Sequence, residues 1–334
     1  MQQYLKKAFL FASLAFAPYV ILVIIFVLKD PFRIHTYPPY IDGFHHINRG
    51  VVTTNGYLKS SNVNTVIFGN SRSISIRCDD LIEFCNPCKK CFHFDASGDN
   101  QYGFAQKVKL ISQHQDKLNE VFIFLDDQAI STTPLSPDGF PFVRHPVYGE
   151  KTWMEFYFVF LWQYLKLPYQ YAHLTKNHSM GAHWVQEINY KDCGFEESSA
   201  DYMPAQENQI ELDSLSFYRN NSELPQAFED VTYDMSSTQQ DSLQQIIESL
   251  EALGAQCTII FHPRYKRTHP SIETLDAIKK KMPQTNVFDA SHFDIVLNND
   301  GYWYETSHFR PIAGKMILEA IYSGEIPPHA LQLP

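Results

Sequence analysis

The sequence lacks the patterns that identify several large classes of protein. No Walker loop and no Gly-x-Gly-x-x-Gly segment occurs in its 334 residues, so nothing in it supports nucleotide chemistry. The histidines at positions 45, 46, 262 and 269 do not form the ligand set of a metal site. A formal net charge of −10 argues against nucleic-acid binding, because contacts with phosphates need a basic face. We therefore expect no nucleic-acid partner, no metal and no cofactor.

A second long apolar run is also absent, and the single one lies at the N-terminus. Residues 8–28 carry no charge, and about 20 apolar residues are enough to cross a bilayer as a helix. Lysines within residues 1–7 favour a cytoplasmic N-terminus. We therefore expect a cytoplasmic tip at 1–7, a single-pass membrane anchor at 8–28, and the globular part in the periplasm or the extracellular space.

A cleavable signal peptide is the alternative interpretation of this run. The Ala-Phe-Ala sequence at residues 15–17 is similar to a signal-peptide cleavage site. However, Pro18 follows it at once and the apolar run continues to Leu28, which is too long for an ordinary signal core. These two features favour the uncleaved anchor.

Cysteine is sparse, but four of the six cysteines lie in one short segment. Cys78, Cys85, Cys88 and Cys91 are spaced C-x6-C-x2-C-x2-C, and the other two, at 193 and 257, stand apart. In an oxidising compartment such a cluster favours local disulfides, although zinc binding and free buried thiols remain alternatives. The sequence does not define which cysteines pair.

Beyond a proline-rich and polar tether at 29–62, short apolar runs alternate with amphipathic segments. We expect strands at 65–68, 91–94, 120–127, 257–261 and 286–290. We expect helices at 101–114, 237–253, 271–282 and 310–324. Strands separated by helices at this spacing predict an α/β domain over 63–325 with a parallel sheet covered on both faces.

A long segment at about 128–235 interrupts this alternation and is rich in aromatic and polar residues. Its run "FYFVFLW" is too short to span a membrane. It can be either a core helix or a surface that rests on the membrane, and we favour the core helix. The segment is expected to be a large insertion in the domain.

The first strand ends abruptly in Gly69, Asn70 and Ser71, which suggests either a simple turn or a serine nucleophile. In parallel sheets, active residues collect at the carboxyl ends of the strands, which is where Ser71 is expected. A serine hydroxyl needs a base within hydrogen-bond reach, and the base needs an orienting partner. Glu305 and His308, just before the last helix, are our candidates for these two roles.

A second carboxylate and histidine with the same spacing lie nearby, at Asp289 and His292. This pair directly follows the fifth strand and shows no helix signal after it, so we prefer Glu305 and His308.

The "GNS" sequence after the first strand and the carboxylate-x-x-His-Phe sequence before the last helix resemble the SGNH/GDSL hydrolase superfamily. The resemblance is strongest to its membrane-anchored members that modify cell-surface polysaccharides or teichoic acids, and it covers residues 60–127 and 236–325. It implies a three-layer α/β/α sandwich with a flavodoxin-like sheet of five parallel strands. It further implies Ser71 as nucleophile, His308 as base, Glu305 as the acid, and the N–H groups of Ser71 and Gly98 as the oxyanion hole.

The sequence departs from the superfamily pattern at three positions. Asn70 replaces the usual aspartate of the first block, and Glu305 replaces the usual aspartate of the last block. The third block, where an oxyanion-binding asparagine is expected, contains Asp126 and Asp127. An anion at that position opposes an oxyanion unless it is protonated or only orients a neighbour. Asn100 is a candidate for the missing donor.

The predicted function is a serine-dependent acyl esterase or O-acyltransferase that acts on acyl or acetyl groups of an envelope polysaccharide. The expected partners are that polysaccharide or its acyl donor. Arg264, Lys266 and Arg267 follow the fourth strand and can bind an anionic glycan or lipid phosphate, or form a solvated basic loop. The alternative function is a non-catalytic scaffold of the same fold that binds a glycan or a membrane acyltransferase partner.

Overall fold

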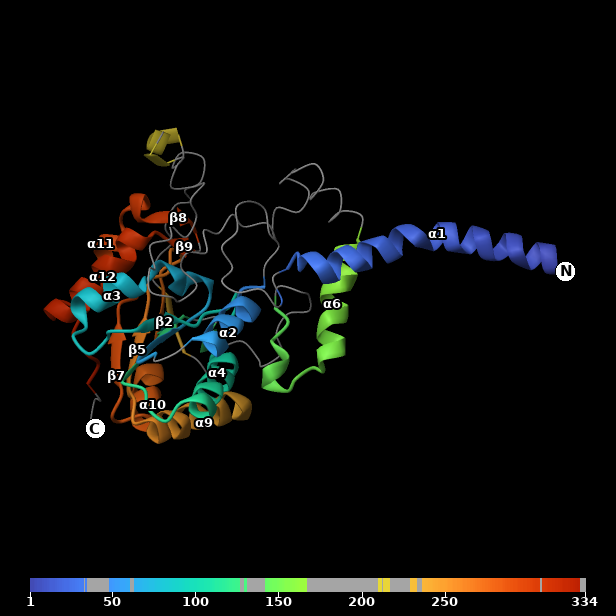
Figure 1. Ribbon diagram of the computed structural model, residues 1–334. Coiled ribbons are helices and arrows are strands. Elements are labelled where there is room, and N and C mark those ends of the chain that lie inside the picture. Colours follow the sequence, from blue (N-terminus) through green and yellow to red (C-terminus); the bar gives the residue numbers. More distant parts are fainter. Residues whose placement is uncertain are drawn as a thin grey trace.

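A five-stranded parallel sheet lies at the centre of the protein in the computed structural model (Figure 1). The structure describes residues 1–32, 34, 48–60, 63–126, 129–130, 142–166, 210–211, 213–216, 229–232, 236–306 and 308–330. The strands of the central sheet are β1 (Thr65–Phe68), β2 (Cys91–His93), β3 (Glu120–Leu125), β5 (Gln256–Phe261) and β7 (Asn286–Asp289). Their spatial order is β2-β1-β3-β5-β7, with every neighbouring pair parallel, which is the order of flavodoxin-like sheets.

Helices cover both faces of this sheet and make three layers (Figure 1). One face carries α2 (Arg49–Lys59), α4 (Gln101–His114), α9 (Ser237–Leu253) and α10 (Ile272–Lys281). The other carries α3 (Cys78–Phe84), α11 (Asp294–Leu297) and α12 (Pro311–Ser323). Alternate residues of β1 explain why both faces are apolar, because Val66 and Phe68 pack into the first layer while Ile67 packs into the second.

The predicted parallel α/β architecture is therefore confirmed, and the expected strands and helices are present with small shifts at their ends. A five-residue 3₁₀ helix, η1 (Ser71–Ser75), directly follows β1. Other short elements were not expected. An antiparallel hairpin of β8 (Trp303–Glu305) and β9 (His308–Phe309) precedes α12, with η5 (Asp300–Tyr302) before it. The short helix α11 follows the Asp289 and His292 pair, where the sequence showed no helix signal.

The predicted tether at 29–62 differs from the structure in its second half. Helix α2 lies there, with Val51, Val52 and Tyr57 buried, and the ring of Tyr57 stacks on that of Phe94 with centroids 5.2 Å apart. The part of the segment that precedes the sheet domain is thus packed on it. A small parallel pair of β4 (Glu229–Val231) and β6 (Thr268–Pro270) lies apart from the central sheet.

The four clustered cysteines form two disulfides, Cys78–Cys91 and Cys85–Cys88. The first one ties the start of α3 to the start of β2, the edge strand of the sheet. Cys257 is a free thiol buried in β5. The sixth cysteine, at position 193, lies outside the described residues.

Helix α1 (Gln2–Lys29) is long and apolar enough to cross a membrane, judged by length and composition. It projects away from the sheet domain, and its C-terminal part contacts α6 (Trp153–Leu165), the helix formed by the aromatic run of the predicted insertion (Figure 1). The 3₁₀ turn η2 (Pro146–Tyr148) precedes α6. Most of the remaining insertion lies outside the described residues.

Candidate active site

The Gly-Asn-Ser segment forms a tight turn at the carboxyl end of β1. A β-carbon on Gly69 would lie 2.3 Å from both Cβ and Oγ of Ser73, so only glycine fits where the chain folds back on itself. The Asn70 side chain caps the turn by accepting a hydrogen bond of 3.0 Å from the Arg72 N–H. Ser71 therefore begins η1 at the edge of the sheet, half-buried.

The hairpin before α12 brings a histidine to this turn. His308 begins β9, and its Nε2 lies 3.0 Å from the Oγ of Ser71. A hydroxyl and an imidazole at this distance can share a proton, which is what the activation of a serine nucleophile needs. The structure thus brings together two residues that are 237 positions apart in the chain.

We call residues 69–75, from Gly69 to the end of η1, the serine turn. Two further contacts hold the hairpin and α12 against it. The hydroxyl of Ser75 donates to the backbone oxygen of Phe309, the residue after His308. In α12, Gly314 faces the turn so closely that a β-carbon would lie 2.1 Å from the backbone oxygen of Ser75. The position of His308 relative to Ser71 is therefore set by packing between α12 and η1.

Glu305, the predicted acid, lies in β8 directly opposite His308 in the hairpin register. Its side chain lies outside the described residues. The backbone register places the two residues as cross-strand neighbours, and β-carbons of such neighbours are typically about 5 Å apart. The orienting role of Glu305 stays a prediction.

Asp126, the third-block position, is buried at the end of β3 and forms the centre of a cluster below the serine turn. Its carboxylate accepts from the Arg72 guanidinium, from Arg264 Nη1 at 3.1 Å and from Asn70 Nδ2 at 3.1 Å. Its second oxygen accepts from the backbone N–H of Ala129 at 2.7 Å. Asp127, the neighbouring candidate, lies outside the described residues.

The protonation state of Asp126 follows from these partners. Burial alone would raise the pKa of this carboxyl, but the adjacent His262 and the two guanidiniums outweigh it and hold the pKa well below its usual range. His262 Nε2 is 3.6 Å from the carboxylate. Asp126 is therefore an anion whose charge is offset by two arginines, so it orients Asn70 and Arg72 beside Ser71.

Of the three predicted anion-binding residues, the structure brings only Arg264 to the serine turn, through Asp126. Arg267 instead donates to Asn298 Oδ1 at 2.5 Å. Lys266 is exposed. Arg72 was not singled out from the sequence, although its position directly after Ser71 could have drawn attention to it.

The loop after β2 supplies Gly98 and Asn100, the predicted oxyanion donors. It passes beside the serine turn, because the N–H of Ala96 donates to the backbone oxygen of Gly69 at 3.4 Å. Gly98 adopts a φ of +62°, which favours glycine. The side chain of Asn100 accepts from the Gly103 N–H at 3.1 Å, so its oxygen caps α4.

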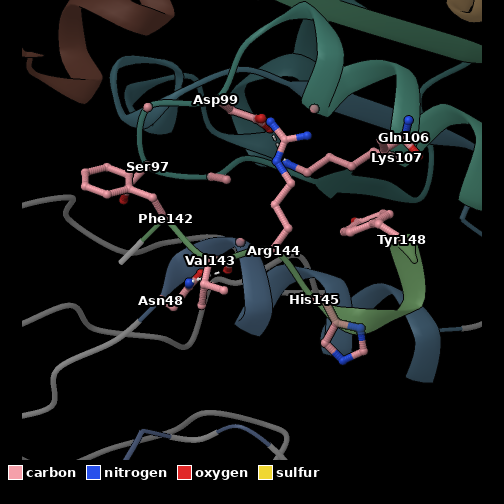
Figure 2. A pocket seen from close by; sticks show the side chains of 14 residues that line it. Asn48, Ser97, Asp99, Gln106, Lys107, Phe142, Val143, Arg144, His145 and Tyr148 are labelled. Atoms are coloured by element: carbon pink, nitrogen blue, oxygen red, sulfur yellow. Dashed lines mark hydrogen bonds and ion pairs between the residues drawn. The ribbon is translucent and has the colours of Figure 1, made fainter. Parts of the chain in front are cut away.

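A cavity lies beside this loop (Figure 2). Gly98 forms one wall, and Phe142, Arg144, and Tyr148 line the side that precedes α6. The Arg144 guanidinium lies over the ring of Tyr102, 4.6 Å from its centroid. Aromatic rings beside polar groups are typical of ligand sites, and no motif pointed to these residues before the structure was known.

The alternative carboxylate and histidine pair has a local role in the structure. The Asp289 carboxylate accepts from the backbone N–H of Ser291 at 3.0 Å and from its hydroxyl, while His292 Nε2 is 3.9 Å away. The His292 side chain is 53 % exposed and its ring stacks on that of His269 at 3.8 Å. The pair lies in the turn after β7.

A second serine and histidine pair was not expected from the sequence. Ser73 Oγ is 3.0 Å from His93 Nε2, and both residues are buried beneath the serine turn. Burial lowers the pKa of His93 to about 4 against the opposing charge of Asp95, so the imidazole is neutral near pH 7. The Ser73 hydroxyl donates a hydrogen bond of 2.8 Å to the backbone oxygen of Asn70. The pair therefore stabilises the turn and does not face solvent.

Comparison with known proteins does not identify the chain, since no protein-family model matches it and no curated protein does.

Proposed function

We propose that the protein is an SGNH-like serine hydrolase or acyltransferase that removes or transfers acyl groups of an envelope polysaccharide. The hydrogen-bond distance of 3.0 Å between Ser71 Oγ and His308 Nε2 at the carboxyl edge of a parallel sheet carries this proposal. Ligands bind at this edge in flavodoxin-like sheets, near the point where the strand order reverses. Here β1 lies between β2 and β3 at that point.

In the proposed reaction, Ser71 Oγ attacks the carbonyl carbon of the acyl ester while His308 Nε2 takes the hydroxyl proton. The N–H groups of Ser71 and Gly98 stabilise the oxyanion of the tetrahedral intermediate. The intermediate then collapses, and His308 returns the proton to the leaving sugar oxygen. Water or an acceptor hydroxyl, deprotonated by His308, attacks the acyl-serine; His308 then returns the proton to Ser71 Oγ, and the acyl group leaves on the oxygen of the water or the acceptor. Glu305 stabilises the imidazolium.

The sugar is proposed to dock against the mouth of the cavity beside Gly98, whose interior of about 30 Å³ has room for water and not for a sugar ring. Phe142 and Tyr148 offer apolar faces, and Arg144 offers a polar group in the same lining (Figure 2). Carbohydrate rings present apolar faces and rim hydroxyls, which match such a lining.

We further propose that α1 anchors the protein in the cytoplasmic membrane, with the sheet domain in the periplasm or the extracellular space. The length and apolar composition of α1 support the anchor, and the two disulfides support an oxidising compartment.

Fluorophosphonate labelling of the full-length protein tests the serine chemistry. We expect labelling at Ser71, none in Ser71→Ala, and a loss of about 100-fold or more in the labelling rate of His308→Ala, the usual effect of a lost general base. His292→Ala is the matched control and should label like the wild type. Normal labelling of His308→Ala, or none of the folded wild type, would contradict the mechanism.

A non-catalytic glycan-binding scaffold is the second candidate, and the aromatic cavity favours it because the cavity does not include Ser71 or His308 in its lining. This function predicts saturable polysaccharide binding that is unchanged in Ser71→Ala and lost in Tyr148→Ala, with no acyl turnover.

A further inference from the structure

Helix α6 is apolar on two sides, and the described part of the chain covers only one of them. Phe156, Phe160 and Tyr164 are buried against the end of α1 and the segment that follows it. The opposite side presents Met154, Phe158 and Trp162, which are spaced four residues apart and are 83 %, 62 % and 60 % exposed. We call these three residues the outer face of α6. Its composition is that of a surface that contacts an apolar environment.

The packing of α6 on α1 fixes where this face lies. The ring of Tyr164 contacts that of Phe26 in α1 with centroids 5.5 Å apart, and Leu22 packs against the same cluster. In Figure 1, α6 runs across α1 rather than along it, and α1 continues past α6 away from the sheet domain. If α1 crosses a bilayer, α6 therefore extends along the membrane surface.

The rise of an α-helix gives the depth of the contact between α1 and α6 within the apolar stretch of α1. Phe26 and Leu22 lie two and six residues before Leu28, the last apolar residue of α1. At about 1.5 Å per residue, they are about 3 Å and 9 Å inside the apolar stretch. Helices that lie in a membrane interface bury their apolar face by about 5–10 Å, a range that overlaps these depths.

We propose that the outer face of α6 inserts among the lipids of the outer leaflet of the membrane that α1 spans. This inference depends on the anchoring role of α1 proposed above, but not on the serine chemistry. The side chains fit the location, because tryptophan is enriched at membrane interfaces. Lys151 and Lys166, exposed just outside the two ends of α6, can reach lipid phosphates.

Lipid is favoured over a second copy of the chain because the outer face continues the apolar surface of α1, which contacts lipid in the anchoring role proposed above. The exposed apolar side chains of α1 extend up to its contact with α6, with Ile24 and Ile25 51 % and 39 % exposed. A face at the depth of the acyl chains meets lipid wherever no protein covers it.

The insertion would place the cavity beside Gly98 next to the membrane. His145 lines the cavity, and its ring packs on Trp153 and Phe156 with centroids 5.1 Å and 5.9 Å apart. On the side of His145, α6 therefore lies between the cavity and the proposed lipid, and a helix with its side chains is about 10–12 Å wide. Such a site is suited to a substrate that is presented at the membrane surface.

Site-directed fluorescence in vesicles tests the proposal. Phe158→Cys and, as the control, Glu319→Cys on the exposed side of α12 are labelled with the dye NBD in full-length protein that carries Cys193→Ser. Cys257 is buried and the other four cysteines are paired, so the introduced thiol reacts alone. The proteins are reconstituted in vesicles of phosphatidylcholine and phosphatidylglycerol, some containing spin-labelled lipid.

We expect blue-shifted emission at position 158 and quenching by the spin-labelled lipid several-fold stronger than at position 319. Equal lipid quenching at both positions, with position 158 open to aqueous iodide or covered by a second copy, would overturn the proposal. Release of the protein by alkaline carbonate would overturn it together with the anchor. Fluorophosphonate labelling of the same samples reports separately on Ser71, so a failure of the serine chemistry is distinguishable.

Discussion

At the scale of single residues, the conformation of the serine turn depends on a steric constraint at Gly69 and on paired charges around Asp126. Gly69 gives the chain room to fold back, since any β-carbon there would collide with Ser73. Asp126 then fixes the two residues that flank Ser71, by accepting hydrogen bonds from Asn70 and Arg72. The Asp126 carboxylate therefore holds Asn70 and Arg72 in place, and in the proposed mechanism the two arginines offset the charge that would otherwise oppose an oxyanion.

Replacing Asp126 tests this positioning role. In Asp126→Asn two guanidiniums lose the anion between them, and we expect the free energy of unfolding to fall by about 3 kcal/mol, the lower end for a broken buried ion pair. Both arginine side chains are 12 % exposed, so water partly compensates. Urea unfolding measures the change in the free energy of unfolding. In Asp126→Asn protein that is still folded, the fluorophosphonate labelling rate at Ser71 should also fall.

Asp116→Asn, on an exposed loop, is the matched control and should change the free energy of unfolding by less than about 0.5 kcal/mol. If Asp126→Asn behaves like this control, the cluster does not hold the turn.

At the scale of elements, the candidate site is an interface between η1 and the final hairpin and helix. The turn after β1 provides the serine, while β9 provides the histidine. The two are held together by the Ser75 hydrogen bond to Phe309 and by the close approach of Gly314 in α12 to Ser75. The geometry of the Ser71 and His308 pair therefore depends on how deeply α12 packs.

A single methyl group at position 314 tests that dependence. Alanine normally stabilises a helix interior by about 1 kcal/mol relative to glycine. Here the new β-carbon would collide with a backbone oxygen, so we expect Gly314→Ala to lower the free energy of unfolding by about 1–3 kcal/mol, as overpacking does. The labelling rate at Ser71 should fall because His308 moves with α12.

Glu319→Ala, exposed on the same helix, controls for general effects on α12. A Gly314→Ala protein that is more stable than the wild type would show that α12 does not pack as closely as described.

At the scale of the whole molecule, the buried His93 links the stability of the fold to pH. Its pKa is lowered from 6.5 to about 4, first by burial and further by the charges of Arg49 and Lys107, against Asp95. The folded state therefore binds fewer protons than the unfolded state between these values. The stability that depends on neutral His93 is fully present above pH 6.5 and is lost as the pH falls toward 4.

We expect acidification over this window to cost on the order of 3 kcal/mol through His93, because each pKa unit corresponds to about 1.4 kcal/mol. Urea unfolding of wild type and His93→Gln at several pH values between 7 and 4 measures it, and the difference between the two should shrink as the pH falls. Parallel pH profiles would contradict the assignment.

The apolar patterns of the sequence were sufficient to predict the parallel sheet and the helices that cover it. Continuous apolar runs such as that of β3 are typical of strands buried on both sides, and Gly254 correctly marked the end of α9. These features are local, because the residues of each segment set its own pattern of burial and its backbone propensity. The apolar composition of α1 was visible for the same reason.

Only the tertiary structure decided which of these residues meet. Glu305 with His308 and Asp289 with His292 have the same spacing, and the fold alone brings His308 to Ser71 and leaves His292 on the turn after β7. The cysteine pairing, the cluster at Asp126 and the cavity beside Gly98 were likewise undetermined. Such contacts join residues far apart in the chain, and their distances are set by the packing of whole elements, which no local pattern contains.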